Sequence, residues 1–371
     1  MNIIILKFGG KLLETPAKII QAAKYIIKAK DRGETPIVIV SAPGNTTAKF
    51  IELAHQISSD PDKREMDMLL SVGERTAMAL LAIAINDLSK YSAISFTGSQ
   101  VGIITDTQHL NAKVLEVRGY RIQDALDKKQ IPIIAGFQGV SVDKEITTLG
   151  KGGSDLTAVS LAIAFKAQRC ELVKEHGGVF SADPEIISGA VLHSKVDYDT
   201  MESLSASGAT VVQSRAVALA KHHTVKLNVT GIDDRPGTNI SDVNVNLKSV
   251  AAIQVENGLA VSSEFDMSKE FSADGHWQAI VWNRQNGIVA FDNGTKSDSN
   301  RSSSIVTILG WSNGIDDEVI SKIFHYITES KTVPEACFGT RRGLSFLLPS
   351  EVANDFARDI HSLCLENSFI N

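Results

Sequence analysis

The sequence predicts an α/β protein with a mainly parallel sheet in residues 1–240, followed by a smaller α+β region in residues 241–371. In the first part, short runs rich in isoleucine and valine alternate with helix-length segments. This βαβα rhythm is typical of a parallel sheet covered by helices. The rhythm changes near Asp233–Thr238, where a Pro-Gly pair lies in a polar setting. The length of 371 residues predicts two or three domains of roughly 150 residues each.

Apolar runs of the first part are expected to be strands because they are short and rich in β-branched residues. They are Ile3–Leu6, Ile37–Val40, Ile94–Phe96, Ile131–Ala135 and Val225–Val229. Helices are expected between them, including Pro16–Lys30, Gly73–Leu88 and Asp155–Ala167. Ligands bind beyond the carboxyl ends of the strands in such sheets, so we expect functional residues in the loops after these runs.

The second part is expected to form one small α+β unit, or two similar ones. Its expected strands are Val250–Val255, Trp277–Trp282, Ile288–Phe291, Ile305–Leu309 and Leu344–Leu348. Its expected helices are Asp316–Thr328 and Glu351–Leu363. The polar stretch Thr295–Ser304 is expected to be a loop or a short linker.

The composition excludes several classes of protein. Hydrophobic residues make up 43% and charged residues 22%, so the chain is neither wholly disordered nor collagen-like. The net charge of −6 argues against a nucleic-acid-binding protein. Cys170, Cys337 and Cys364 are too few and too scattered for a disulfide framework or a zinc cluster, which favours the cytoplasm. The apolar run Ala77–Ile85 is shorter than the roughly 20 residues of a membrane helix, so no membrane partner is expected.

The first expected strand runs directly into Lys7-Phe8-Gly9-Gly10. Adjacent glycines let the backbone approach an anion closely, and their N–H groups can then point at phosphate oxygens. Lys7 would supply a compact positive charge for a phosphate. The spacing matches neither a P-loop nor a GxGxxG fingerprint. The alternative is a simple strand-to-helix turn with a surface lysine.

The second expected strand ends at the segment Ser41–Thr47, SAPGNTT. Its hydroxyl groups and its glycine turn suit the binding of a carboxylate or a phosphate. The alternative is a polar turn in which a threonine caps the next helix.

Gly73-Glu74-Arg75 opens an apolar helix. The helix dipole favours an acidic side chain at this end, which explains Glu74 without any function. The functional alternative is that Glu74 pairs with the ammonium group of a ligand.

The segment Thr147–Ala158, TTLGKGGSDLTA, is the most specific motif. Its glycines, its lysine and its Ser-Asp pair lead into a helix, so the loop presents N–H groups and a positive helix end to an anion. Asp155 is itself an anion, so we expect it to orient Lys7 or another cation rather than to contact phosphate. The alternative is a glycine hinge with a capping aspartate.

The segment Gly177–Pro184, GGVFSADP, offers a glycine pair, an aromatic ring and an Asp-Pro turn. It could form the edge of a nucleotide site, or it could be a plain loop.

Taken together, the motifs are typical of phosphoryl transfer by positioning. Such a site needs glycine loops that bind the phosphates, cations on the transferring group and separate residues that hold the acceptor.

In these motifs the sequence resembles the aspartate kinases of the amino-acid kinase superfamily. The matching pieces occur in the order of the family and cover about the first 240 residues. They are Lys7–Gly10, Ser41–Thr47, Gly73–Arg75, Thr97–Asp106, Ala135–Gly139, Thr147–Ala158 and Ala182–Pro184. The C-terminal part, especially Val306–Leu363, looks like the regulatory ACT domains that follow the kinase domain in this family.

The resemblance implies a three-layer α/β sandwich that binds ATP and L-aspartate and forms 4-phospho-L-aspartate, the first step towards lysine, threonine and methionine. By matched position, Lys7 stabilises the transferring phosphoryl group and Asp155 organises the cations. The implied substrate contacts are Ser41, Thr47, Glu74, Lys151 and Ser154. The implied ATP contacts are Gly9, Gly10, Gly152, Gly153, Lys174, Glu175, Phe180, Asp183 and Pro184. Mg²⁺ would bridge the phosphates, with no metal ligand expected from the chain.

For the C-terminal part, the resemblance implies a homodimer through this region and feedback by an amino acid such as lysine or threonine. The alternative is a dimerisation module without an effector site.

Several positions depart from the pattern of the family, mostly in the half that would hold ATP. They are Lys11 and Leu12 for Thr-Ser, Lys151 for arginine, Lys174 and Glu175 for Thr-Asp, Phe180 for tyrosine, Glu185 for arginine, Thr210 for lysine, and Gln213 and Ser214 for His-Pro. Lys151 replaces a guanidinium group, which can donate two parallel hydrogen bonds to a carboxylate, with a compact ammonium charge. Three hypotheses follow: an aspartate kinase, a kinase of another amino acid or small carboxylate, or a regulatory paralogue that binds ligand without turnover.

Overall fold

The computed structural model describes residues 2–175, 177–209, 211–233, 235–243, 249–262, 277–283, 287–292, 303–330, 332–340 and 342–365. Contacts within the chain divide it into two compact units. The first unit comprises Met1–Val179, His193–Glu202 and Thr210–Val243. The second comprises Phe180–Leu192, Ser203–Ala209 and Asn244–Asn371. The predicted domains 1–240 and 241–371 differ from these units at three segments: 180–192 and 203–209 belong to the second unit, and 241–243 belongs to the first.

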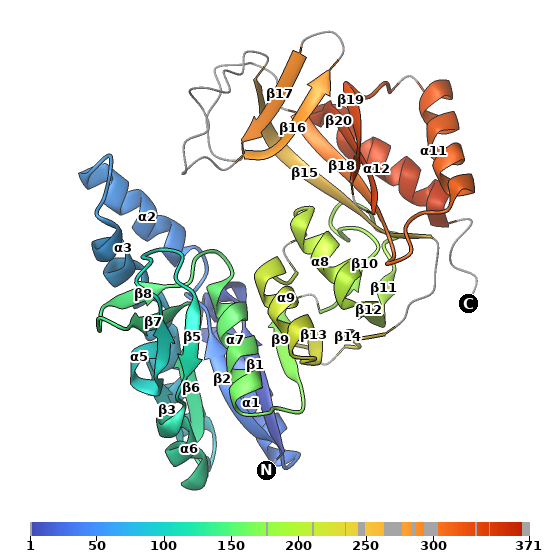
Figure 1. Ribbon diagram of the computed structural model, residues 1–371. Helices are drawn as coiled ribbons and strands as arrows, with labels where there is room; N and C mark the ends of the chain where they lie inside the picture. Colours follow the sequence, from blue (N-terminus) through green and yellow to red (C-terminus); the bar gives the residue numbers. More distant parts are fainter. Residues whose placement is uncertain are drawn as a thin grey trace. The chain divides into compact units, whose positions relative to one another are not determined.

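The first unit is built on an eight-stranded sheet with the order β12-β14-β13-β9-β1-β2-β6-β3 (Figure 1). The strands are β1 (Ile3–Phe8), β2 (Thr35–Val40), β3 (Ala93–Phe96), β6 (Ile131–Ala135), β9 (Cys170–Lys174), β12 (Lys195–Asp197), β13 (Leu227–Gly231) and β14 (Thr238–Ser241). The strands β13, β9, β1, β2, β6 and β3 run parallel to one another, whereas β14 is antiparallel to β13. The predicted mainly parallel sheet is therefore confirmed.

Helices cover both faces of this sheet and give three layers. Helices α1 (Pro16–Asp31) and α4 (Val72–Leu88) pack on one face, and α7 (Gly153–Ala164) packs on the other, with α9 (Ser214–His222) against it. Sequence signals define their ends: α1 begins with Pro16 at its first position, and the Thr15 side chain accepts a hydrogen bond from Lys18 N at 3.3 Å. The remaining helical segments of the first unit are η1 (Gly10–Leu13), α2 (Thr46–Ile57), α3 (Lys63–Leu70), α5 (Gly98–Val101) and α6 (Tyr120–Asp127). Helix α8 (Tyr198–Ala206) is shared, because its residues from Ser203 on belong to the second unit.

The alternation of β1 decides which side chains face which layer. Ile4, Leu6 and Phe8 are fully buried in the core shared with α1 and α4. Because successive side chains point to opposite faces, Lys7 points to the face on which α7 packs. A single polar residue in this apolar strand is thereby directed to one side of the sheet.

Helices α3 and α4 form one nearly continuous apolar stretch, Lys63–Leu88, with a mean hydropathy of 1.6 over its best 18 residues. Its length and composition would allow it to span a membrane, but half of that window is buried within the protein. Ala77, Leu81 and Ile85 are fully buried against the sheet. These features are typical of the core helix of an α/β domain.

A smaller sheet with the order β5-β4-β7-β8 supports the glycine-rich loop. Its strands are β4 (Ile103–Thr105), β5 (Val114–Val117), β7 (Gln138–Ser141) and β8 (Ile146–Thr148). Strand β8 ends at Thr148, and α7 begins at Gly153 rather than at the predicted Asp155. The loop of residues 149–152 is therefore anchored by a strand before it and a helix after it.

The second unit contains a six-stranded antiparallel sheet with the order β16-β17-β15-β18-β20-β19. Its elements are β15 (Val250–Ser262), β16 (Trp277–Asn283), β17 (Gly287–Asp292), β18 (Ser303–Gly310), β19 (Ala336–Thr340), β20 (Gly343–Pro349), α11 (Asp317–Glu329) and α12 (Ser350–Leu365). All predicted strands and helices of this region are confirmed. Most of the predicted loop Thr295–Ser304 lies outside the described residues, and its last two residues begin β18.

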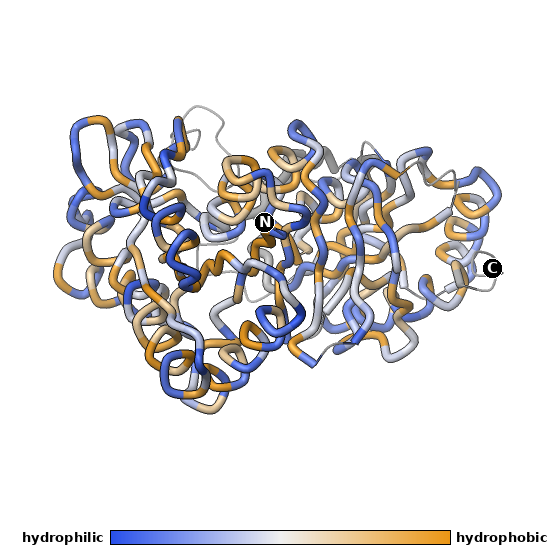
Figure 2. Tube along the Cα trace, turned by 90° about the horizontal axis from the view of Figure 1, so that it is seen from below, coloured by the Kyte–Doolittle hydropathy of each residue, from blue (hydrophilic) through white to orange (hydrophobic). Residues whose placement is uncertain are grey.

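Hydropathy along the chain follows this layering. Hydrophobic and hydrophilic residues alternate within the trace of the helices, as expected for helices that bury one side (Figure 2).

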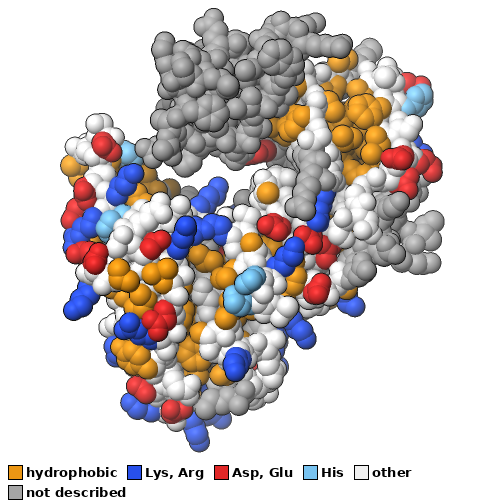
Figure 3. All heavy atoms as spheres, in the orientation of Figure 1, with side chains coloured by type: hydrophobic (Ala, Val, Ile, Leu, Met, Phe, Trp, Pro, Cys, Tyr) orange, Lys and Arg blue, Asp and Glu red, His pale blue; other side chains and the backbone are white. Residues whose placement is uncertain are grey.

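Charged side chains of both signs are interspersed with hydrophobic ones on the face of the first unit that Figure 3 shows. This face therefore carries no field of a single sign.

Candidate active site

Lys7 and Asp155 meet at the carboxyl end of the central sheet. Lys7 is the fifth residue of β1, and Asp155 lies in the first turn of α7. The Nζ atom of Lys7 lies 2.6 Å from Oδ1 of Asp155, and both side chains are buried. The predicted convergence of these two residues is therefore confirmed.

The neighbours of Asp155 keep its carboxylate charged. Burial by itself would raise its pKa, but the Lys7 and Lys174 ammonium groups outweigh burial, so the pKa of Asp155 lies below its ordinary value. The backbone N–H of Gln213 also donates a hydrogen bond to Oδ2 at 3.3 Å. Asp155 is thus surrounded by positive groups and a donor, which suits a residue that orients cations.

Glycines allow the tight loop that precedes α7. Gly150 and Gly152 have φ angles of 74° and 76°, in the left-handed region where other residues are strained. A Cβ atom on Gly152 would lie 1.8 Å from Cγ of Gln213. Arg215, which the motifs did not single out, donates a hydrogen bond from Nη1 to the Leu149 carbonyl at 2.9 Å. The positive φ angles, the close approach of Gly152 to Gln213 and the Arg215 hydrogen bond therefore shape the loop that leads into α7.

The loops that follow β1 and β2 lie against each other. Ser41 N donates to the Phe8 carbonyl at 3.2 Å, and Gly44 N donates to the Gly10 carbonyl at 2.9 Å. A Cβ atom on Gly10 would lie 2.4 Å from the Ala42 carbonyl oxygen. The two predicted motifs therefore form one continuous surface at the end of the sheet that carries Lys7.

Glu74 is buried in the first turn of α4. Its Oε1 atom accepts a hydrogen bond from Ala42 N at 2.9 Å, whereas Oε2 has no hydrogen-bond partner among the described residues. Gly73 permits this approach, since a Cβ atom there would lie 2.6 Å from Cβ of Ala42. Burial raises the pKa of Glu74 to about 7, although the Ala42 hydrogen bond and the Lys7 ammonium lower it. A buried carboxylate with one free oxygen is suited to a cationic ligand group.

Lys174 and Glu175 lie at the end of β9, next to β1. Burial lowers the pKa of Lys174 to about 8, Lys7 lowers it further, and Asp155 offsets part of this effect. The Glu175 carboxylate forms an ion pair with Lys18 of α1, with Oε1 and Nζ 2.7 Å apart. Lys174 therefore interacts with the Lys7–Asp155 pair, whereas Glu175 is held towards α1.

The remaining predicted substrate residues have different environments. Ser154 is buried, and its Oγ atom would lie 2.9 Å from a Cβ atom on Gly136. Ser41 and Thr47 are partly exposed, and Lys151 is exposed in the glycine loop. Their assignment as substrate contacts stays a prediction.

The predicted nucleotide contacts Phe180, Asp183 and Pro184 belong to the second unit. There, Asp183 Oδ1 accepts a hydrogen bond from Glu185 N at 2.9 Å. Their contact with ATP stays a prediction as well, and Thr210 lies outside the described residues.

The family model described as "Amino acid kinase family" matches residues 2–231. The chain belongs to the amino acid kinase family. Among its relatives, an "Aspartokinase" of Mycolicibacterium smegmatis is 41% identical over 271 residues, which cover 72% of this chain and 63% of that protein. The alignments with the first three such relatives span about 60–63% of their length.

Solved structures also resemble this chain. A crystal structure of E. coli aspartokinase III in complex with aspartate and ADP has a TM-score of 0.76 at 19% identity and covers 98% of this chain and all of that chain. A crystal structure of aspartate kinase from Synechocystis has a TM-score of 0.60 at 26% identity and covers all of this chain and 70% of that chain. These likenesses confirm the predicted fold class.

Asp67 is a buried residue of the first unit that the motif analysis missed. It is fully buried in α3 and accepts hydrogen bonds from Thr148 Oγ1 at 2.5 Å and Leu110 N at 3.2 Å. The Nδ1 atom of His109 lies 2.7 Å from its Oδ2 atom. Asp67 therefore ties α3 to the strand that leads into the glycine loop. The available signal was an aspartate on the apolar side of a helix, three residues before Leu70.

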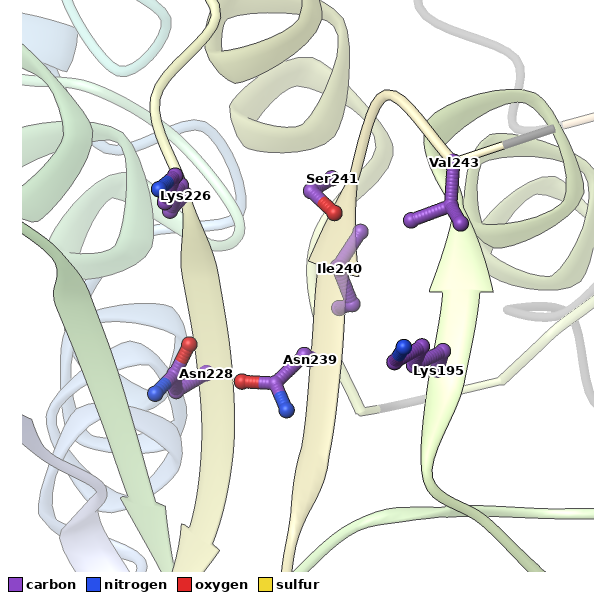
Figure 4. Close-up of a pocket in the computed structure, with 7 residues that line it drawn as sticks. All are labelled: Lys195, Lys226, Asn228, Asn239, Ile240, Ser241 and Val243. Carbon is purple, nitrogen blue, oxygen red and sulfur yellow. The ribbon is translucent and has the colours of Figure 1, made fainter.

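A separate pocket of about 280 Å³ lies over the edge strands β12, β13 and β14 (Figure 4). Its lining residues are Lys195, Lys226, Asn228, Asn239, Ile240, Ser241 and Val243. Lys195, Asn239 and Asn228 are paired in register across the three strands. Asn228 pairs with Glu171, whereas Lys7 pairs with the next residue, Leu172. Because successive side chains point to opposite faces, this row of residues lies on the face opposite Lys7. The pocket is therefore distinct from the candidate active site.

Proposed function

We propose that this protein transfers the γ-phosphoryl group of ATP to the side-chain carboxylate of L-aspartate and forms 4-phospho-L-aspartate and ADP. The observation that carries the proposal is the buried Lys7–Asp155 pair at the end of the sheet, 2.6 Å apart and flanked by glycine loops. Similarity to proteins named aspartokinase supports aspartate as the acceptor.

The chemistry requires positioning rather than a covalent intermediate. An oxygen of the acceptor carboxylate forms a bond to the γ-phosphorus, and the bond from that phosphorus to the oxygen bridging to ADP breaks. Negative charge on the transferring group is stabilised by cations and N–H donors that are already in place. Lys7 supplies such a cation, and Asp155 holds its ammonium in position.

The acceptor is held at the opposite side of the transferring group from ADP. We assign the ammonium of aspartate to Glu74, whose Oε2 atom is buried without a hydrogen-bond partner among the described residues. Ser41, Thr47 and Ser154 would contact the substrate through their hydroxyl groups, and Lys151 would attract a carboxylate.

The nucleotide is held mainly by backbone. We assign the phosphate contacts to the backbone of Gly9, Gly10, Gly152 and Gly153, because N–H groups of glycine loops can approach an anion closely. Close packing excludes a side chain at Gly10, next to the Ala42 carbonyl, and at Gly152, next to Gln213. Mg²⁺ would be bound through the phosphates of ATP. Within the described residues, no three His, Cys, Asp or Glu side chains cluster in a way that could hold a metal ion.

We assign a regulatory role to the C-terminal region, within a chain of two domains, 1–240 and 241–371. It would form a homodimer and bind an amino-acid effector such as lysine or threonine. The solved relatives include E. coli aspartokinase III with lysine and aspartate. The protein would act in the cytoplasm, in the synthesis of lysine, threonine and methionine.

The decisive test is incubation of the full chain with ATP, Mg²⁺ and L-aspartate, with the acyl phosphate trapped as a hydroxamate. We expect hydroxamate from the wild type and none from Lys7→Ala. A signal no larger than that of Lys7→Ala, with both proteins folded, would refute the proposal. A parallel screen of other amino acids and small carboxylates tests the second acceptor hypothesis, which is motivated by Lys151 and is excluded if aspartate is the best substrate.

A non-catalytic regulatory paralogue is the second candidate. The observation in its favour is Glu175, which is bound to Lys18 rather than free to contact a nucleotide. Calorimetry with Mg-ATP decides between the two, because binding in the micromolar range removes the basis of this alternative.

A further inference from the structure

Lys174 lies on the same face of the central sheet as Lys7. In the parallel pairing of β1 and β9, Lys7 is opposite Leu172, and Phe8 is opposite Val173. Lys174 is two residues beyond Leu172, and side chains two apart point to the same face. Val173 and Phe8 both lie in the core on the other face, which agrees with this assignment. Lys174 therefore projects beside Lys7, one strand across and closer to the end of the sheet.

The charges on this face are unbalanced. Asp155 is the acidic group that acts on both Lys7 and Lys174. It forms its ion pair with Lys7 at 2.6 Å. The side-chain ammonium of Lys174 makes no hydrogen bond or ion pair with any residue that the structure describes, although Lys174 is only partly exposed. A partly buried ammonium without an acceptor is costly unless an anion binds there.

We propose that Lys174 is a catalytic residue that contacts the terminal phosphate of ATP and, together with Lys7, carries the charge of the transferring phosphoryl group. This inference rests on the proposed function, because it takes ATP as the donor. Lys174 is protonated once the nucleotide is bound and stays so during the transfer, so this step transfers no proton. It donates hydrogen bonds to oxygens of the group while the bond to ADP breaks and the bond to the acceptor carboxylate forms.

The contact with the terminal phosphate distinguishes this role from general attraction of nucleotides. Removing the ammonium should weaken binding of a nucleotide that has a γ-phosphate and leave binding of ADP nearly unchanged. A lysine with a merely structural role would change both affinities alike, or neither.

The test compares Lys174→Met and Lys174→Arg with the wild type and with the control Lys195→Met. Lys195 is an exposed lysine of the same sheet, in the pocket on its opposite face (Figure 4). Calorimetry measures the affinity for the Mg²⁺ complexes of a non-hydrolysable ATP analogue and of ADP. For Lys174→Met we expect about 10- to 100-fold weaker binding of the analogue, the loss of one charge-assisted hydrogen bond. Binding of ADP should change less than about threefold, and Lys174→Arg should recover most of the loss.

Equal loss for both nucleotides, or no loss, overturns the inference. Thermal melting establishes that each variant is folded. If Lys174→Met does not fold, proton uptake by the wild type on binding each nucleotide is measured instead. The measurement uses pH 8.5 and buffers of different ionisation enthalpy. We then expect greater uptake on binding the analogue than on binding ADP, and equal uptake overturns the inference. Because calorimetry needs no turnover, a wild type that binds the analogue but forms no hydroxamate refutes the proposed function alone.

Discussion

Replacing Asp155 with asparagine should destabilise the first unit more than replacing Lys7 with methionine. Removing one partner of a buried ion pair costs about 3–5 kcal/mol, because the other charge stays buried without compensation. Asp155→Asn leaves two ammonium groups, Lys7 and Lys174, without their carboxylate, so we expect the upper part of this range. Lys7→Met leaves Asp155 with Lys174 and the Gln213 N–H, so we expect about 2–3 kcal/mol.

These costs convert to shifts of the melting temperature. At roughly 2–4 °C per kcal/mol for a unit of this size, Asp155→Asn should lower it by about 8–20 °C and Lys7→Met by about 4–12 °C. Differential scanning calorimetry at pH 7 measures both, together with the double variant. The double variant should melt at a higher temperature than the sum of the two single shifts predicts, because it removes both partners of the pair and leaves neither charge uncompensated. Additive losses, or a larger loss for Lys7→Met, would refute the reasoning.

The other predictions concern single contacts. Because the pKa of Glu74 is about 7, kcat/KM for aspartate should rise with pH and level off above about pH 7. Glu74→Gln should remove this rise and lower kcat/KM about 10- to 100-fold. An unchanged pH profile in Glu74→Gln would contradict the assignment. Gly152→Ala should cost about 1–3 kcal/mol in urea unfolding, from its positive φ and its collision with Gln213. Adding Gln213→Ala removes the collision with Cγ but keeps the one with Cβ at 2.5 Å, so it should recover only part of the loss, and full recovery argues against backbone strain. Asp67→Asn should cost about 1–3 kcal/mol by weakening its contact with His109, and an unchanged urea midpoint would show that the contact is dispensable.

The ionisation of Glu74 also affects stability. Its folded pKa of about 7 lies above its ordinary value of 4.5. The folded state therefore binds its proton more tightly than the unfolded state does, and this stabilising contribution is lost as the pH rises from about 4.5 through 7. Asp155 acts in the opposite direction, because its pKa is lowered: its contribution is present above its ordinary pKa of 3.8 and is lost as the pH falls through its lower folded value.

Much of the fold could be predicted from local patterns. The run Ile3–Leu6 is a strand because β-branched residues favour extended backbone, and Pro16 with Thr15 marks the start of a helix. Boundaries were predicted less well: α7 begins at Gly153, two residues before Asp155, after a glycine loop whose Leu149 carbonyl accepts a hydrogen bond from Arg215 of α9.

The sequence by itself determined that Lys7 lies near the end of a strand and that Asp155 follows a glycine-rich loop at the start of a helix, because strand length and glycine content are local properties. Tertiary structure alone decided that these two side chains meet, that Lys174 shares their face and that Glu175 is drawn to Lys18. The physical reason is register: which side chains become neighbours depends on how strands far apart in the chain are paired. The same reason explains why residues 180–192 pack with the second unit, since the core that buries Ile187 includes Val250 and Phe356.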